Sequence, residues 1–124
     1  MTSSLLTYIM AIDALAAESE RVRSVDLADA LGVARASVCK AMDRLTEGGY
    51  AVRGGGGGLR LTEKGCEVVK NYAPARRLVR SMFADKLGLP AQRAERESLA
   101  VLGVLSEDTV KRIARLYEGG EERK

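Results

Sequence analysis

Basic and hydroxyl side chains follow one another at helical spacing near the middle of the first half of the chain. Arg35 and Ala36 begin this segment, and Ser37, Lys40 and Arg44 follow at separations that share one helical face. Arginine and lysine donate hydrogen bonds to guanine or to phosphate, and serine bonds to either. The pattern indicates a nucleic-acid contact, with Arg35 predicted to read a base and Arg44 to clamp a phosphate. An ordinary solvated polar face is the competing interpretation.

A second group of candidate contacts flanks a run of five glycines. Arg53 comes directly before Gly54–Gly58, and Arg60 follows two residues after the run. Consecutive glycines cannot hold a helix or a rigid strand, so the run predicts a hairpin tip. The two arginines would lie near each other across the hairpin and contact a phosphate backbone or the minor groove. A slack loop explains the glycines equally well, whereas a nucleotide-binding loop is excluded because no Gly-Lys-Ser/Thr follows.

Apolar periodicity predicts the helices that position these side chains. A first amphipathic helix is expected over residues 4–17. A short second helix is expected between Ser24, which can cap its backbone amides, and Gly32, which can adopt the left-handed C-terminal conformation. The third helix then presents an apolar stripe opposite the basic face, formed by Val38, Ala41, Met42 and Leu45. Two short helices separated by a tight turn are typical of a helix-turn-helix.

Two short strands, at residues 50–53 and 59–61, complete a winged helix, and the rest of the chain reads as helical. Thr62 is predicted to cap a long helix that reaches about Lys86, with a bend or a split into two helices at Pro74. Two shorter helices are expected over residues 91–102 and, capped by Ser106, over 107–117. The fold class is therefore mainly α. The predicted domains are a winged helix-turn-helix DNA-binding domain over 1–65 and an all-helical dimerisation domain over 66–117, followed by a polar tail over 118–124.

Composition narrows the possible functions. The 124 residues include no histidine, which removes the commonest general base and metal ligand, so no enzyme activity is predicted. Cys39 and Cys66 lack metal-binding spacing and are expected to be ordinary thiols. No membrane span or signal peptide is evident, and the protein is expected to be cytoplasmic. Residues 1–32 carry two basic and five acidic side chains, whereas residues 33–64 carry six basic and three acidic. This basic stretch fits phosphate contact.

The motifs resemble those of a known regulator family. "VRSVDLADALGVARASVCKAMDRLTEGGY", from Val22 to Tyr50, and "GLRLTEKG", from Gly58 to Gly65, are similar to the N-terminal domain of the diphtheria toxin repressor family of metal-dependent regulators. The segments "RRLVRSMFADKLGL" and "VLSEDTVKRI" extend the resemblance over nearly the whole chain, at two-domain length. The resemblance implies a homodimeric repressor whose second domain dimerises and holds iron or manganese.

The sequence departs from this family at the metal ligands. Matched to the family's pattern, the ligand positions are occupied by Thr7, Met10, Arg76, Arg80, Glu95, Leu99, Leu102 and Gly103. Only Glu95 is a suitable ligand for a hard metal, and Met10 is a poor one for Mn(II). No metal or other cofactor is therefore predicted. Instead, Arg76 and Arg80 are expected to contact Glu95, with Glu97 as a possible second partner, in a forked contact that joins two helices.

The resulting functional prediction is a sequence-specific regulator, acting as a repressor on double-stranded DNA without a metal switch. A homodimer would present two recognition helices to a near-palindromic operator. The alternative is a winged helix that serves as a protein-interaction module, in which the basic stripe binds an acidic partner. Salt-dependent, sequence-preferring binding to duplex DNA would separate the two.

Overall fold

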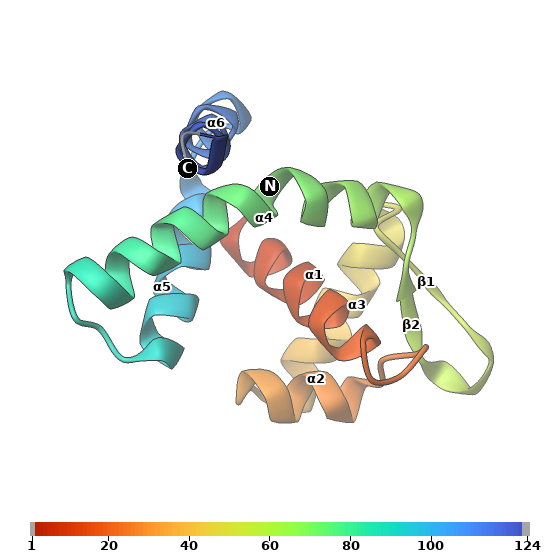
Figure 1. Cartoon of the computed structure of the whole chain (residues 1–124). Helices are drawn as coiled ribbons and strands as arrows, with labels where there is room; N and C mark the ends of the chain where they lie inside the picture. Colours follow the sequence, from red (N-terminus) through yellow and green to blue (C-terminus); the bar gives the residue numbers. More distant parts are fainter. Residues whose placement is uncertain (1, 123–124) are drawn as a thin grey trace. The chain divides into compact units, whose positions relative to one another are not determined.

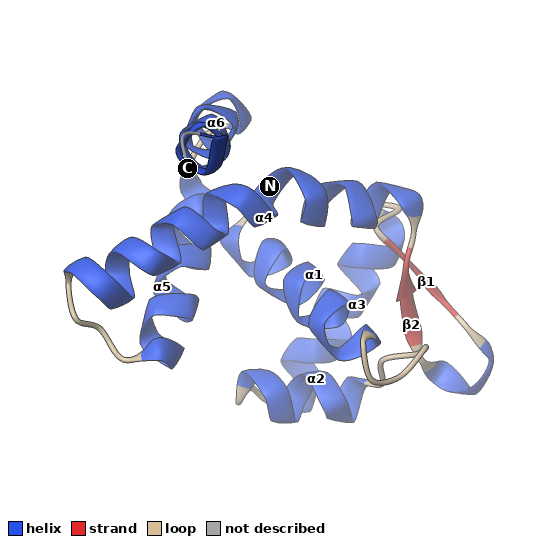
Figure 2. Cartoon of the chain, in the orientation of Figure 1, coloured by secondary structure: helices blue, strands red, loops and turns tan. Residues whose placement is uncertain are grey.

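The computed structural model describes residues 2–122 and is mainly helical, as predicted (Figures 1 and 2). Its helices and strands, in chain order, are α1 (Ser3–Ala16), α2 (Ser24–Leu31), α3 (Arg35–Glu47), β1 (Ala51–Arg53), β2 (Leu59–Leu61), α4 (Glu63–Ser81), α5 (Ala91–Val104) and α6 (Glu107–Glu122). A short 3-10 turn, Gly55–Gly57, lies between the strands, and a π-helical turn, Met82–Lys86, follows α4. No helix among the described residues is long and apolar enough to cross a membrane.

The chain divides into two compact units. The N-terminal unit comprises Tyr8–Val69, and the C-terminal unit comprises Met1–Thr7 together with Lys70–Lys124. The division falls within α4, four residues after the domain boundary predicted between residues 65 and 66, and the first turn of α1 groups with the C-terminal unit. Both α1 and α4 therefore contribute residues to both units.

The N-terminal unit contains the helix-turn-helix. A turn of three residues joins α2 to α3, and Gly32 closes α2 in the predicted left-handed conformation, with φ +64° and its N–H bonded to the Ala28 carbonyl. The N-terminal cap of α2 differs from the prediction. Ser24 is already the first helical residue, so its hydroxyl does not cap the helix. The Asp26 carboxylate instead accepts a 3.1 Å hydrogen bond from the backbone N–H of Arg23.

The apolar stripes predicted from sequence form the core of this unit. All four stripe residues of α3, Val38, Ala41, Met42 and Leu45, are buried. They share the core with apolar side chains from α1, α2 and the strands, including Ile9, Ile12, Leu27, Ala51 and Leu59. Burial of one face of α3 leaves its opposite face on the surface.

The wing is a two-stranded antiparallel hairpin with an additional bridge. Ala51 pairs with Leu61, Val52 with Arg60 and Arg53 with Leu59. Val22, in the loop that follows α1, forms reciprocal backbone hydrogen bonds with Leu59, at 3.0 and 2.8 Å. This loop was predicted only as a connection between two helices. The bridge ties the base of the wing to the start of the helix-turn-helix.

The C-terminal unit is built from most of α4 with α5 and α6. Of the bend or split expected at Pro74, the split does not occur, because α4 runs as one helix through this residue. Tyr72, Ala75 and Val79 are buried on either side of the proline, and this burial offsets the cost of the missing backbone hydrogen bond. The Thr62 and Ser106 caps are present, with N–H donors from Gly65 and Thr109 at 3.2 Å.

The last helix is longer than the sequence predicted. α6 continues through Glu122, so most of the segment expected to be a polar tail is helical, and only residues 123–124 of that tail lie outside the described residues. Extending an existing helix costs far less than nucleating a new one, so the two glycines at 119 and 120 do not end it.

Candidate nucleic-acid interface

The exposed face of α3 presents the side chains predicted to contact DNA. Arg35, Ala36, Ser37, Lys40 and Arg44 are all exposed, opposite the buried stripe. Arg35 is the first residue of the helix, Lys40 lies near its middle and Arg44 lies near its end. Such a face offers donors to both base edges and phosphates when the helix enters a major groove.

The N-terminus of α3 adds backbone donors to this surface. Ala34 occupies the N-cap position in an extended conformation and supplies no side-chain hydrogen bond to the helix. The first-turn N–H groups are therefore not blocked by a side-chain cap. Uncapped N–H groups at a helix start, together with the helix dipole, favour a phosphate or another anion.

The two predicted wing arginines lie on opposite faces of the hairpin, which corrects the expectation that they are near neighbours. Arg60 is paired with Val52, whereas Arg53 is paired with Leu59 on the other face, because successive strand side chains alternate. Arg53 is directed to α3, where its guanidinium Nη2 lies 2.6 Å from the Asp43 carboxylate. Arg60 remains exposed, and Arg53, though exposed, is partly neutralised by Asp43.

The glycine tip is folded rather than slack. The Gly54 N–H bonds to the Gly58 carbonyl at 2.8 Å, and the Gly57 N–H bonds to the Gly54 carbonyl at 3.3 Å. Gly56 and Gly57 have φ values of +82° and +83°, which favour glycine. The guanidinium of Arg21, a loop residue with no predicted role, donates to the Gly55 carbonyl.

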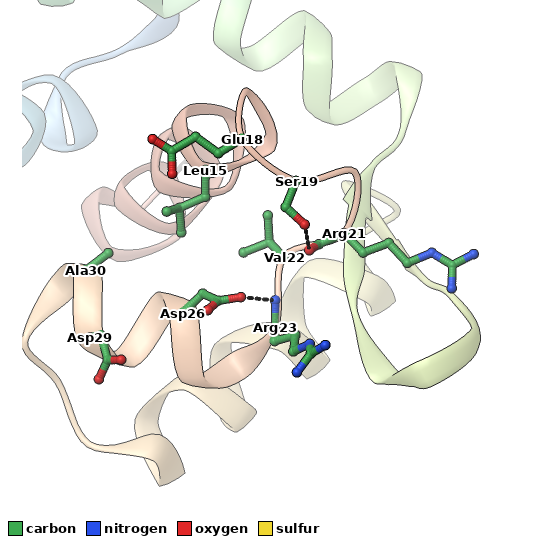
Figure 3. A pocket seen from close by; sticks show the side chains of 9 residues that line it. All are labelled: Leu15, Glu18, Ser19, Arg21, Val22, Arg23, Asp26, Asp29 and Ala30. Carbon is green, nitrogen blue, oxygen red and sulfur yellow. Dashed lines mark hydrogen bonds between the residues drawn. The ribbon is translucent and has the colours of Figure 1, made fainter.

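A shallow hollow of about 580 Å³ lies between the end of α1, the following loop and α2 (Figure 3). Three carboxylates and two arginines are among its lining residues, which are Leu15, Glu18, Ser19, Arg21, Val22, Arg23, Asp26, Asp29 and Ala30. Two of its polar groups are used in local hydrogen bonds: the Ser19 hydroxyl donates to the Arg21 carbonyl at 3.0 Å, and Asp26 accepts from Arg23. Figure 3 shows the Arg21 side chain leaving the hollow toward the wing.

Comparison with known proteins agrees with this geometry. The model of the IclR helix-turn-helix domain matches residues 9–55. The chain is 31% identical over 121 residues to the HTH-type transcriptional regulator MntR of Lysinibacillus sphaericus (strain C3-41). The aligned segment covers 98% of this chain and 86% of that protein. The chain belongs to the diphtheria toxin repressor (DtxR/MntR) family. As a member of this family it is a DNA-binding transcriptional regulator.

Solved structures of regulators share the fold of this DtxR/MntR family member. The metal-dependent transcriptional regulator MtsR superposes with a TM-score of 0.75 at 19% identity, over 95% of this chain and 55% of that one. IdeR from T. acidophilum superposes with a TM-score of 0.71 at 20% identity, over 91% of this chain and 53% of that one. The chain thus spans about half the length of these two regulators.

The positions that match the family's metal ligands do not form a donor set for a metal. Leu99, Leu102 and Gly103 are buried and bring no ligand atom, and Met10 is buried among apolar side chains. Thr7 is half-buried near the start of α1. Among residues 2–122, no group of three or more Cys, Asp or Glu side chains could hold a metal ion. The side chains at these positions therefore do not suit iron or manganese as ligands.

Glu95 is instead bonded to the arginine predicted to face it. Arg76 Nη1 donates to both carboxylate oxygens of Glu95 at 2.8 Å, and Arg80 Nη1 lies 3.6 Å from Glu95 Oε2. The Arg76 side chain is 20% exposed and that of Glu95 37%. The contact joins α4 to α5 within the C-terminal unit.

Two details of this contact differ from the prediction. A single nitrogen of Arg76 bonds both oxygens, so the geometry is not a fork, and Arg76 Nε is buried without a hydrogen-bond partner among the described residues. Glu97 does not take part, because it pairs with Arg93 one helical turn earlier, at 2.6 Å. Side chains at i and i+4 lie on the same face of a helix, and this spacing brings Arg93 and Glu97 together.

Proposed function

We propose that this regulator is a homodimeric repressor whose DNA affinity is not switched by iron or manganese. The observation that carries this proposal is the Arg76–Glu95 contact, in which the one carboxylate suited to a hard metal already has a cation. The side chains at the other matched positions offer a guanidinium, a thioether, a hydroxyl or no donor atom at all. Neutral aliphatic groups and cations do not coordinate Mn(II) or Fe(II).

The charge around Glu95 also opposes a metal ion. Arg76 and Arg80 both lie within 4 Å of this carboxylate, so the cluster of three side chains has a net charge of +1. A divalent cation would be repelled by two guanidinium groups that are permanently protonated. The same two positive charges that a divalent ion would supply are present here as side chains.

Exposed apolar side chains on the C-terminal unit support the homodimer. Val104 at the end of α5 is 77% exposed and Leu116 on α6 is 69% exposed, and Val101 adds to the apolar surface of α5. Large aliphatic side chains exposed on two consecutive helices provide apolar surface that a second subunit could cover. A dimer would also present two α3 helices to successive major grooves.

The experiment that tests this function begins with selection of bound fragments from the source genome. Affinity for the selected duplex is then measured after chelator treatment and again with added Mn(II) or Fe(II), with a scrambled duplex as control. We expect the same affinity in all three conditions and a steep decrease with salt. Metal-dependent operator binding, or a transition metal that stays bound through purification, would contradict the proposal. Binding of an acidic protein in place of duplex DNA would favour the interaction module.

A further inference from the structure

Arg21 lies in the loop between α1 and α2 with its backbone held on both sides. Its carbonyl accepts a 3.0 Å hydrogen bond from the Ser19 hydroxyl, and the next residue, Val22, is bonded in both directions to Leu59 of the wing. This anchoring fixes where the side chain begins. The side chain then extends along the wing, away from the hollow beside it (Figure 3).

The glycine tip is shaped around this side chain. A Cβ on Gly54 would lie 2.8 Å from Arg21 Cζ and Nε, and a Cβ on Gly58 would lie 2.7 Å from Arg21 Cβ. The backbone at both positions is extended, with φ of −103° and −82°, and any residue could adopt it. A side chain at Gly58 would thus meet the Cβ of Arg21, which cannot move without the backbone, whereas a side chain at Gly54 would displace the guanidinium end of Arg21.

Arg21 supplies the charge that Arg53 does not. The Asp43 carboxylate lies 2.6 Å from the Arg53 guanidinium and partly neutralises its charge. Of the two arginines on the wing strands, Arg60 therefore keeps its full charge. Arg21 is exposed and uses one guanidinium N–H on the Gly55 carbonyl. A guanidinium has five N–H donors, so several remain to bind a phosphate oxygen.

We propose that Arg21 is a DNA-contacting residue of the wing, seated on the glycine tip and donating to a backbone phosphate. The proposal rests on the DNA-binding function of the chain. It assigns two roles to four of the five glycines: Gly54 and Gly58 make room for Arg21, while Gly56 and Gly57 turn the chain in open space. In this arrangement the wing contacts DNA through Arg21 and Arg60.

The first test removes the Arg21 side chain. Arg21→Ala and Arg77→Ala are compared on the selected duplex between about 50 and 200 mM salt; Arg77 is an exposed arginine of the C-terminal unit and serves as the charge-matched control. Each phosphate contact changes the salt slope by about 0.9, and because a DNA-bound homodimer carries two Arg21 side chains, the variant should lose about 1.8 in slope, equivalent to about a twelvefold change in affinity over this range. We expect that loss of slope in Arg21→Ala and the wild-type slope in Arg77→Ala.

The second test moves Arg21 without altering it. Gly54→Ala places a methyl group against the guanidinium, whereas Gly55→Ala places one at 3.4 Å, an ordinary contact. Gly54→Ala should therefore lower duplex affinity about as much as Arg21→Ala, and Gly55→Ala should not. The double variant Arg21→Ala/Gly54→Ala should bind no more weakly than Arg21→Ala alone, because the two changes remove the same contact.

Several results would overturn the assignment. An unchanged salt slope in Arg21→Ala, whether or not affinity falls, would show that no phosphate contact was lost. Equal effects of Gly54→Ala and Gly55→Ala on duplex affinity would show that the DNA contact of Arg21 does not depend on the space at Gly54. A wild-type chain that binds no duplex would overturn the DNA-binding function and this contact with it, whereas binding by wild type with unaltered variants would overturn this contact alone.

Discussion

At the scale of single residues, Arg35 and Arg60 are expected to act differently on DNA. Arg35 is exposed at the first position of α3, where a side chain can reach a base edge, and Arg60 is exposed on β2. Arg35→Ala should cost about 1 to 3 kcal/mol on the operator and relax specificity at one base pair. Arg60→Ala should weaken all duplexes similarly and lower the salt slope by about one for each subunit bound to the duplex.

Fluorescence titration of operator and mutated-operator duplexes at several salt concentrations measures both effects. Each variant serves as the control for the other, because one changes the ratio between sequences and the other changes all affinities together. Unchanged affinity in both variants would remove this surface as the DNA contact.

Glu95 is expected to matter for stability more than other exposed carboxylates of its helix. Glu95→Gln removes the charge that faces two arginines, one of them largely buried. We expect a loss of about 1 to 2 kcal/mol in the free energy of unfolding, less than for a fully buried pair because Glu95 is partly exposed. Glu97→Gln on the same helix, which breaks only the exposed pair with Arg93, should cost less than about 0.5 kcal/mol. Urea unfolding compares them, and equal losses would contradict the proposed role of Glu95.

At the scale of elements, the end of α2 depends on Gly32. Its φ of +64° is unfavourable for a residue with a Cβ, although the space around it is open. Gly32→Ala should therefore lower the free energy of unfolding by about 1 kcal/mol through backbone strain alone. Thermal or urea unfolding is the measurement, with Asp29→Ala, an exposed neighbour on α2, as the control that should stay within about 0.5 kcal/mol. A Gly32→Ala variant with the wild-type free energy of unfolding would show that the end of α2 does not depend on this glycine.

The elements differ in how far the sequence could predict them. The apolar stripe of α3 and the glycine that ends α2 are local signals, so the end of α2 and the buried face of α3 agree with prediction. The side on which Arg53 lies depends on strand register and on Asp43, which comes from another element. The role of Arg21 depends on the Val22–Leu59 bridge, which joins segments that are 37 residues apart and has no local signature.

The candidate site was predictable to a similar extent. Periodicity alone exposes Lys40 and Arg44, and the family resemblance points to Arg76 and Glu95. It did not reveal that one nitrogen of Arg76 bonds both oxygens of Glu95, nor that Glu97 turns to Arg93. These choices follow from rotamers and from the approach of two helices, and single-sequence patterns carry no such information.

At the scale of the whole molecule, the proposed dimer predicts a concentration-dependent mass. Sedimentation at micromolar concentration should give twice the mass of the 13.3 kDa chain. Val104→Glu combined with Leu116→Glu should shift the equilibrium toward monomer, because the charges would have to be buried in the interface. Val25→Glu, on the N-terminal unit, is the matched control and should leave the mass unchanged. A wild-type chain that stays monomeric would rule out the dimer.

The Arg76–Glu95 contact has a consequence for how operator occupancy is controlled in the cell. In the proposed regulator a guanidinium that belongs to the chain takes the place of the metal ion, so a change in the metal supply would not change the charge at this position. Operator occupancy would then follow the copy number of the chain, set by its synthesis and by dilution as cells divide. When most chains are monomeric, the dimer concentration rises as the square of the chain concentration, so doubling synthesis raises it about fourfold. Control would pass from the metal supply of the cell to the promoter of the regulator's own gene.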